Sequence, residues 1–476
     1  MAQEKERKRV IPLKFNLAYA TGEITDAVAY QGFSFLIFNF YYFVVGMKVE
    51  VLTLLYVLWS IYNAFNDPFL GGLSDKTRTK WLGGGRRRPW MIAAWVPLSL
   101  IMFFLFTPLA SYESNPVWSS AYFFVVICLF DTIYTAFSLN RTSLYPEMFR
   151  TNRERESAGA ARRIMMIVGL ILAMGLPTFI VGDLSDPWNI YKYWIAGGAL
   201  GGIVFITAFI NIMWGVKEPP LEEMEKKETT GVFKSIWITL KNWKFLVFVL
   251  CSLMNWYVFA IFPMVMNMYN KFLLKADWMG ENESLFGAIL LLVAFVSSGV
   301  GVIIWSKVDA RLGSKVGFIL SQAFWVCCLI PLFFVENYFV ALGIMVLNGI
   351  ALGGSPYFID RHVSNIADED ELRTGQRREA SFYGVHALII RLSGVFAILS
   401  TMWVLRDNGY SLWTDADVLN PPTGLKFLSV NSLVSLFPAI ALILGIIFLI
   451  IYPINRKEVK ALQEAYKTSK AKEEKL

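Results

Sequence analysis

The sequence has little charge for its length. Only 17% of its 476 residues are Asp, Glu, Lys or Arg, whereas 56% are hydrophobic; soluble proteins average about 25% charged and about 45–50% apolar residues. A soluble fold has too little interior to bury so much apolar surface. The composition therefore excludes an ordinary soluble protein and indicates a chain whose natural solvent is lipid.

Cysteine is also scarce. The four cysteines, Cys128, Cys251, Cys327 and Cys328, all lie inside apolar runs, as small buried hydrophobic residues do. Their spacing fits neither a metal site nor a disulfide framework. The run Gly83–Gly85 precedes three arginines but lacks the strand-to-helix context of a phosphate loop. With no nucleophile–base pair either, we expect no enzyme activity and no cofactor.

Long apolar segments dominate the chain. A membrane helix needs about 20 mostly apolar residues, and twelve segments qualify. The predicted spans are Phe15–Val45, Val51–Leu73, Trp90–Leu109, Val117–Leu139, Ser157–Val181, Tyr191–Val216, Phe245–Leu273, Leu285–Trp305, Val316–Val335, Tyr338–Phe358, Phe382–Leu405 and Phe427–Ile451.

Basic residues lie on alternate connections between these spans. The two termini and the loops on their side hold 37 of the 44 Lys and Arg residues, the opposite side holds 6, and Arg391 lies within a span. Because basic loops stay in the cytoplasm, we expect a cell-membrane protein with both termini cytoplasmic. The net charge of +7 then reflects topology, and no clustered basic face indicates a nucleic-acid partner.

The spans divide into two halves. We predict an N-terminal six-helix bundle over residues 1–216, a cytoplasmic linker over 217–244, a C-terminal six-helix bundle over 245–452 and a cytoplasmic tail over 453–476. The loops after the fourth and tenth spans share residues at a constant spacing: Arg150, Thr151, Arg155 and Glu156 recur as Arg373, Thr374, Arg378 and Glu379. Repeated six-helix halves are typical of secondary transporters, whose substrate site lies near the midplane.

Several polar side chains lie where lipid excludes charge, at a cost of about 2.5–3.5 kcal/mol for each charge at the centre of a span. Glu23 and Asp26 share one face of the first span at i, i+3. Trp59, Asn63 and Asp67 form a stripe on the second span at i, i+4, i+8. These residues predict a polar cavity that holds a solute or a cation.

Later spans add to this set. Asp131 and Ser138 lie two turns apart on one face of the fourth span, Arg163 lies early in the fifth, and Arg391 lies near the middle of the eleventh. Carboxylates accept hydrogen bonds from sugar hydroxyls, and arginine binds oxygen pairs in a bidentate manner. We therefore assign substrate binding to Asp26, Trp59, Asp131, Ser138, Arg163 and Arg391.

Charges at the cytoplasmic ends of helices predict a gate. An Asp near a helix end pairs with Arg on a neighbouring loop while the cytoplasmic side is closed, and the pair breaks on opening. The alternative is that these charges only set topology. The candidates are Asp75, Arg78, Asp309, Arg311, Arg373 and Arg378.

Two long motifs carry a family resemblance. The run NDPFLGGLSDKTRTKWLGGGRRRPW (Asn66–Trp90) and the run ADEDELRTGQRREASFYG (Ala367–Gly384) resemble the hallmarks of the glycoside–pentoside–hexuronide:cation symporters, which include melibiose permease. The resemblance extends over all twelve spans. It implies an all-α membrane protein of the major facilitator fold, with two pseudo-symmetric six-helix bundles, alternating access and sugar uptake coupled to sodium or protons.

The resemblance also implies roles for single residues. The sugar-binding Asp of the first span falls on Asp26, the cation-site Asp of the Asn-Asp-Pro motif on Asp67, the sugar-contacting Arg on Arg163, and a basic residue, usually Lys, on Arg391. Three positions depart from melibiose permease. Two carboxylates and a Trp of that protein are replaced here by Asn63, Ser138 and Thr142.

These departures affect the expected coupling ion. Sodium prefers several oxygen ligands with nearby negative charge, and two carboxylates are missing. A proton needs one carboxylate of suitable pKa. We therefore favour a proton at Asp67, with Asp26, Glu23 or Asp131 as other carriers, while Asn63 still offers an oxygen to sodium.

Three functions follow as hypotheses. The first is a cation-coupled symporter for a sugar, glycoside or uronide, acting as a monomer in the lipid bilayer. The second is a symporter of lysolipids or other amphiphiles on the same scaffold, because the eukaryotic lysolipid symporters also resemble this family. The third is a passive channel or a non-transporting receptor, which buried charges and duplicated halves disfavour.

Overall fold

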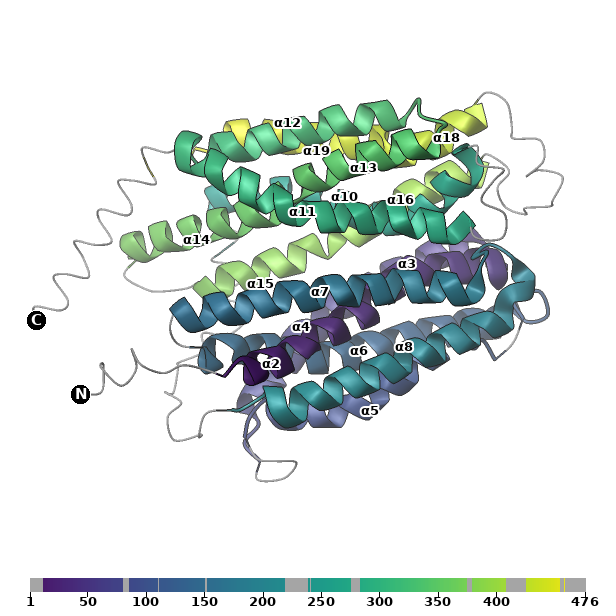
Figure 1. Ribbon diagram of the computed structural model, residues 1–476, viewed down its shortest axis with the longest axis horizontal. Helices are drawn as coiled ribbons and strands as arrows, with labels where there is room; N and C mark the ends of the chain where they lie inside the picture. The colour runs from purple at the N-terminus through teal and green to yellow at the C-terminus, as the bar shows by residue number, and fades with distance from the viewer. Residues whose placement is uncertain are drawn as a thin grey trace, which may run out of the picture. The chain divides into compact units, whose positions relative to one another are not determined.

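The structure, a computed structural model, describes residues 12–79, 85–109, 111–149, 152–218, 239, 241–274, 283–374, 379–407, 425–453 and 458. Within each of the two units defined below, the helices run alongside one another (Figure 1). Among the described residues, extended pairing is limited to a single bridge between Thr79 and Gly85. Contacts divide the chain into two units. Unit 1 comprises Met1–Lys227 with Met279–Ala288, and unit 2 comprises Glu228–Trp278 with Ile289–Leu476.

The helices have the following bounds. The earlier ones are α2 (Leu13–Asp26), η1 (Ala27–Gln31), α3 (Gly32–Asn39), η2 (Phe40–Val44), α4 (Val49–Lys76), α5 (Arg88–Phe104), α6 (Pro116–Met148), α7 (Asn152–Val181), η3 (Pro187–Asn189), α8 (Ile190–Ile210) and η4 (Asn211–Gly215). The later ones are α10 (Trp243–Leu273), α11 (Glu283–Leu312), α12 (Ser314–Leu332), α13 (Tyr338–Leu352), α14 (Gly354–Thr374), α15 (Glu379–Ile390), α16 (Leu392–Asp407), α18 (Leu425–Val434) and α19 (Leu436–Ile451).

Each of the twelve predicted spans lies on helix. Ten helical segments among the described residues are long and apolar enough to cross a membrane. The two others are α5, which is apolar but only 17 residues long, and α4, which is 28 residues long and carries the predicted polar stripe. The predicted all-α class is confirmed. Helices are expected because lipid offers the backbone no hydrogen-bond partners.

Several predicted boundaries differ from the structure. The third span ends earlier, at Phe104, and the eighth and tenth extend to Leu312 and Thr374. The fourth span was expected to end at Leu139, but α6 continues to Met148, since the sequence from Asn140 to Tyr145 has no Gly or Pro to end it. The eleventh span is interrupted, because Arg391 forms a turn between α15 and α16.

Asparagine caps begin several spans. The Asn115 side chain accepts a hydrogen bond from the Trp118 backbone N–H at the start of α6, and Asn242 accepts one from Phe245 at the start of α10. Asn337 does the same for α13. Such caps satisfy N–H groups that the first turn of a helix leaves unpaired.

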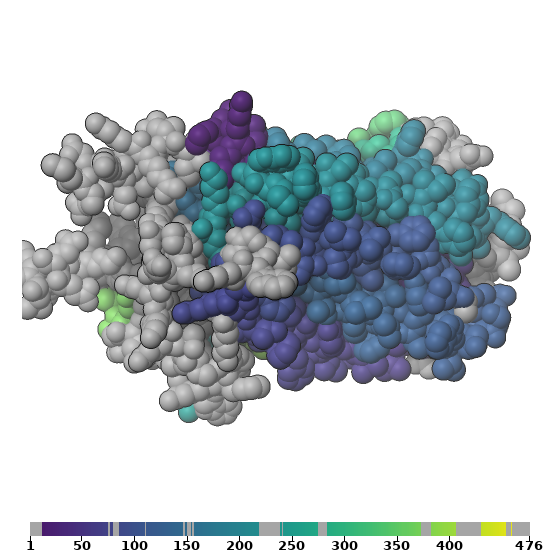
Figure 2. Space-filling model, turned by 90° about the horizontal axis from the view of Figure 1, so that it is seen from below, coloured from purple at the N-terminus to yellow at the C-terminus, as the bar shows by residue number. Residues whose placement is uncertain are grey.

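The first span lies in the interior of unit 1. It runs from Leu13 to Val44 as α2, η1, α3 and η2. In its apolar stretch 78% of the residues are buried, compared with 39% in the corresponding stretch of α7. It packs against α7, α8 and η4. Figure 2 shows residues of this unit, coloured purple to teal, packed closely together on the face in view. The charges of α2 are therefore held among other helices.

The Glu218 carboxylate caps the N-terminus of α5. Glu218 accepts hydrogen bonds from the backbone N–H groups of Arg86, Arg87 and Arg88 over 2.8–3.2 Å. Gly85 has φ +111°, and a Cβ there would lie 2.2 Å from Glu218 Oε2. Because α5 begins at Arg88, the carboxylate meets the positive end of the helix dipole.

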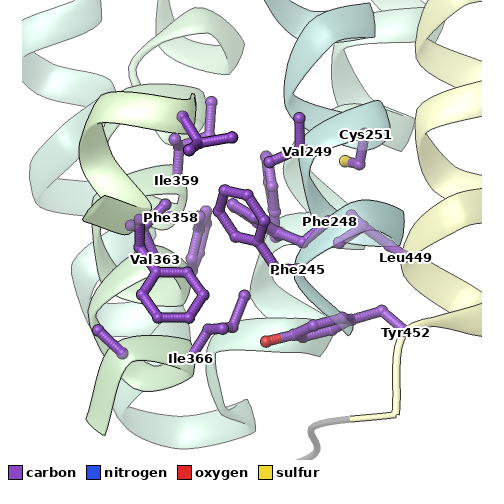
Figure 3. Packing of buried hydrophobic residues seen from close by; sticks show 14 of the residues in the cluster. Phe245, Phe248, Val249, Cys251, Phe358, Ile359, Val363, Ile366, Leu449 and Tyr452 are labelled. Carbon is purple, nitrogen blue, oxygen red and sulfur yellow. The ribbon is translucent and has the colours of Figure 1, made fainter. Parts of the chain in front are cut away.

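Unit 2 has an aromatic core (Figure 3). Phe245 and Phe248 of α10 meet Phe358 and Val363 of α14, and Tyr452 packs against them just after the end of α19. The cluster joins the first helix of this unit to its last, as apolar burial favours.

Candidate functional site

Glu23 and Asp26 lie on one face of α2, as their i, i+3 spacing predicts. Helix α2 ends at Asp26, and the π-helical turn η1 begins at the next residue. Such turns widen a helix locally and are frequent at functional sites. The Glu23 and Asp26 side chains are 11% and 16% exposed, so both carboxylates are largely removed from solvent.

Arg141 pairs with both carboxylates. Its Nη1 lies 3.0 Å from Glu23 Oε1, and its Nη2 contacts Asp26 Oδ2. The side chain is 1% exposed. Gly22 makes room for it, because a Cβ at Gly22 would lie 2.6 Å from Arg141 Cδ. A buried arginine that bridges two acids satisfies the rule that buried charges are paired.

Arg162 adds a second positive charge. Its Nε lies 2.5 Å from Glu23 Oε1, and its side chain is 26% exposed. The guanidinium lies over the Tyr145 ring, 4.5 Å from the ring centroid, in a cation–π arrangement. Glu23, Asp26, Arg141 and Arg162 are called the four-charge cluster below. Arg163, the predicted substrate contact, is exposed one position along.

A second polar group joins α4 and α6. Asn63 Nδ2 donates to Asp131 Oδ1 at 2.9 Å, and Asn66 Nδ2 donates to Asp131 Oδ2 at 3.0 Å. Asp131 is 1% exposed. Both carboxylate oxygens are therefore held by amides one turn apart on α4, as hydrogen bonding to a buried charge requires.

Asp67 lies on the same pair of helices. Its Oδ1 accepts a hydrogen bond of 2.8 Å from Thr135 Oγ1, and Thr135 is one turn after Asp131 on α6. Asp67 and Asp131 are called the α4–α6 carboxylates below. Among the described residues, Asn63 Oδ1 is buried without a hydrogen-bond partner. The helices thus present carboxylate, amide and hydroxyl oxygens close together.

Aromatic rings flank these groups. Tyr30 of η1 stacks on Tyr134 of α6 at 5.4 Å between centroids, one turn from Asp26 and from Ser138. Ser138 of α6 lies beside Asp26. Trp59 packs edge to face on Phe33 at 5.6 Å. The structure therefore brings Asp26 and Ser138 together, as the substrate assignment requires, next to stacked rings.

The predicted gating residues are only partly described. Asp309 is buried in α11 and pairs with Arg361 Nε at 3.0 Å, while Tyr357 Oη donates to it at 2.8 Å. Arg78 and Arg311 are exposed. The side chains of Asp75 and Arg373, and the whole of Arg378, lie outside the described residues.

Arg391 lies at the turn between α15 and α16 and is partly buried. It belongs to unit 2, whereas the other predicted substrate residues belong to unit 1. Within the described part of the chain, no group of three His, Cys, Asp or Glu side chains is placed to hold a metal.

Sequence reasoning missed Arg141 and Arg361. Arg141 lies just after the predicted end of the fourth span at Leu139, so hydropathy places it in a loop. The available signal was its position three residues after Ser138, on the same helical face if the helix continued. For Arg361 no signal was present, since its partner Asp309 lies 52 residues away in the chain.

Known proteins match this chain along most of its length. The family described as MFS/sugar transport protein matches residues 18–456. An uncharacterized symporter of Synechocystis is 23% identical, with 92% of this chain and 94% of that protein aligned. A sodium-dependent lysophosphatidylcholine symporter of zebrafish, Danio rerio, is 22% identical, with 96% and 88% aligned.

Solved structures agree on the fold. The nucleoside transporter NupG superposes with a TM-score of 0.65 at 15% identity, covering 94% of this chain and all of that one. The family match spans nearly all of the described helices, and the resemblance to the cation symporters is confirmed. The chain belongs to the MFS/sugar transport protein family, and it is a multi-pass membrane transporter.

Proposed function

We propose that the chain is a sodium-coupled symporter of a sugar or glycoside, which works by alternating access. The α4–α6 carboxylates hold the cation, and Asp26 contacts the substrate. The observation that carries the proposal is the meeting of Asp67 and Asp131 with Asn63, Asn66 and Thr135 on two adjacent helices.

The coupling ion follows from the number of carboxylates. The sequence favours a proton because two carboxylates of the related sodium site are replaced by Asn63 and Ser138. In the structure Asp131, fixed by Asn63 and Asn66, lies one turn from the residue that binds Asp67. Two carboxylates with neutral oxygens nearby suit a hard cation, which prefers oxygen ligands. This arrangement supports sodium over a proton.

The substrate class follows from the surroundings of Asp26. Among the described residues its Oδ1 has no hydrogen-bond partner, so it can accept one from a sugar hydroxyl. Ser138 lies beside it, and the stacked Tyr30 and Tyr134 lie one turn away. A charged acceptor beside flat apolar faces suits a pyranose ring. The description of the family as sugar transport proteins points the same way.

We further propose a cell-membrane location with both termini in the cytoplasm, from the distribution of Lys and Arg, and a functional monomer. With this orientation, Asp26 lies 13 residues into the first span, or about 20 Å along the helix from its cytoplasmic start. That depth is near the middle of the bilayer, where transporters of this kind bind substrates.

Reconstitution in liposomes tests the proposal. Glycosides and uronides are screened for accumulation under a sodium gradient at fixed pH, and separately under a proton gradient without sodium. We expect sodium to drive accumulation and the Asp67→Asn variant to lose this stimulation, while Glu50→Gln, an exposed acid on the same helix, retains it. Proton-driven accumulation without sodium would overturn the choice of ion, and equilibration without accumulation would indicate a passive channel.

A lysolipid is the second candidate substrate. The zebrafish relative named as a lysophosphatidylcholine symporter aligns with 96% of this chain. The four-charge cluster also offers both signs of charge, which matches a zwitterionic headgroup with a phosphate and a quaternary amine. Accumulation of a fluorescent lysophosphatidylcholine in the same liposomes, without accumulation of any glycoside, would favour this alternative.

A further inference from the structure

The two arginines of the four-charge cluster differ in how firmly they are held. Arg141 contacts Glu23 and Asp26 together, and it is 1% exposed. Arg162 contacts Glu23 alone among the ion pairs described, and it is 26% exposed. Since Glu23 has both arginines as partners, it stays paired if one of them leaves.

Arg141 is enclosed on several sides. The Tyr19 hydroxyl donates to the Arg141 carbonyl at 3.0 Å, and the Tyr19 ring centroid lies 5.8 Å from the guanidinium carbon. A Cβ on Gly22 would lie 2.6 Å from Arg141 Cδ and 2.8 Å from Asn211 Nδ2. Asn211 is itself fixed, as it donates to the Tyr19 carbonyl at 2.7 Å. These contacts restrict the positions that the Arg141 side chain can take.

Arg162 has an open side. Its guanidinium rests on Tyr145, which stacks on Tyr19, and a quarter of its side chain is exposed. A cation–π contact of this kind is worth about 0.5–1 kcal/mol at an exposed site. The arginine fork keeps free donors that can bind a pair of oxygens. Arg162 can therefore exchange Glu23 for a ligand at small cost.

We propose that Arg141 is a positioning residue that holds Glu23 and Asp26 in place, and that Arg162 determines specificity by releasing Glu23 to bind substrate oxygens. This division of labour rests on the proposed function, in which Asp26 contacts the substrate. The cluster holds two positive and two negative charges. When Arg162 turns to the substrate, Arg141 still neutralises Glu23, so no buried carboxylate is left unpaired.

The first experiment needs no substrate. The purified protein is unfolded thermally in detergent as Arg141→Met, as Arg162→Met, and as the double variant Arg141→Met/Asp26→Asn. We expect Arg141→Met to lower the midpoint by about 6 °C or more, because it leaves the buried Asp26 carboxylate without an ion-pair partner. The double variant should recover part of that loss, and Arg162→Met should lower the midpoint by about 2 °C or less.

The second experiment measures uptake as a function of substrate concentration. Arg162→Lys should raise the KM about tenfold and leave the maximal rate within about threefold, as loss of a bidentate contact predicts. Arg141→Lys should lower the maximal rate about 100-fold, because a single ammonium cannot orient two carboxylates. Lys48→Gln, an exposed site outside the cluster, should match the wild type in both.

The outcomes separate the inference from the proposed function. Equal loss of stability in Arg141→Met and Arg162→Met would overturn the inference even if transport were never found. An increased KM in Arg163→Lys with an unchanged KM in Arg162→Lys would overturn it as well and support the assignment from the family resemblance. Wild-type liposomes that take up no glycoside would refute the proposed substrate, while the stability measurements would still decide the role of Arg141.

Discussion

The two units bury different kinds of polar group. Unit 1 buries charge deep in its helices: Glu23, Asp131 and Arg141 are each 9% exposed or less. In the described part of unit 2 the buried charged residues are Asp309 and Asp370, and both lie within four residues of a helix end. Among the described residues, buried charges away from helix ends, such as Asp131 and Arg141, are therefore found in unit 1.

The interior of unit 2 uses amide, hydroxyl, thiol and imidazole groups. Ser252 lies 2.7 Å from His386 Nε2, and Ser355 donates to Asn255 Oδ1 at 2.7 Å. Gln322 Nε2 contacts the Cys251 sulfur at 3.3 Å. Such bonds satisfy polar atoms without the cost of desolvating charge.

This difference suggests that the two units contribute unequally to transport. Ionisable residues inside a membrane are expensive and indicate function, so coupling and substrate recognition are expected to depend mainly on unit 1. Neutral hydrogen bonds in unit 2 favour a structural framework. Arg391, at the helix break of unit 2, is the exception that the sequence also singled out. Substitutions in the two units can test this contrast, beginning with the largest effect.

The sharpest test replaces Asp131 in unit 1 and His386 in unit 2. Asp131→Asn removes the charge and turns one donor toward Asn63 or Asn66, so we expect sodium-driven accumulation to fall about 100-fold. Each lost charge-assisted bond is worth about 1.5–3 kcal/mol. His386→Gln keeps a partner for Ser252, so accumulation should stay within about fivefold, as for a bond of about 1 kcal/mol. Similar losses in both variants, at equal surface expression, would remove the contrast.

An intermediate effect is expected at Asp309 in unit 2. Asp309→Asn weakens the pair with Arg361, which is 45% exposed, and leaves Tyr357 a partner. We expect a loss of about 1–2 kcal/mol in stability and a fall of about three- to tenfold in the initial rate of uptake, if the pair acts as a gate. The measurement is uptake per folded transporter, with Lys307→Gln, an exposed site on the same helix, for comparison. An unchanged rate would leave Asp309 with a structural role alone.

The smallest effect is expected at Glu218. Glu218→Gln keeps the side-chain oxygen but removes the charge at the start of α5, which should destabilise the protein by about 0.5–1 kcal/mol. Because α5 belongs to unit 1 but lies away from the four-charge cluster, the KM for substrate should not change. Thermal unfolding in detergent and uptake kinetics check the two statements. A changed KM would show that the loop before α5 is coupled to the substrate site.

The fold could be predicted almost completely from the sequence. Apolar runs of about 20 residues predict helices because lipid satisfies no backbone group, and all twelve predicted spans lie on helix. The errors are local. Hydropathy shows where the apolar part of a helix ends, but backbone hydrogen bonds can continue the helix beyond that point. Helix α6 accordingly continues about two turns past Leu139.

The site could be predicted in part. Asp26 and Asp131 stood out because each interrupts an apolar run, and the stripe of Asn63 and Asp67 follows from helical spacing. Their partners did not stand out. Arg141 looked like one basic loop residue among many, and the direction of the Asn63 and Asn66 amides toward Asp131 depends on how α4 meets α6. Spacing within a helix is visible in a sequence, but contact between helices is not.

The close approach of Gly22 to Arg141 has a consequence for the history of the family. A protein with a methyl group at position 22 cannot seat an arginine at 141 in the same rotamer, since the gap is 2.6 Å. The two residues should therefore be inherited together, and lineages that lost the arginine should be free to gain alanine or serine at position 22. An alignment of relatives sorted by these two positions should separate transporters with a four-charge cluster from those that recognise their substrates by another arrangement.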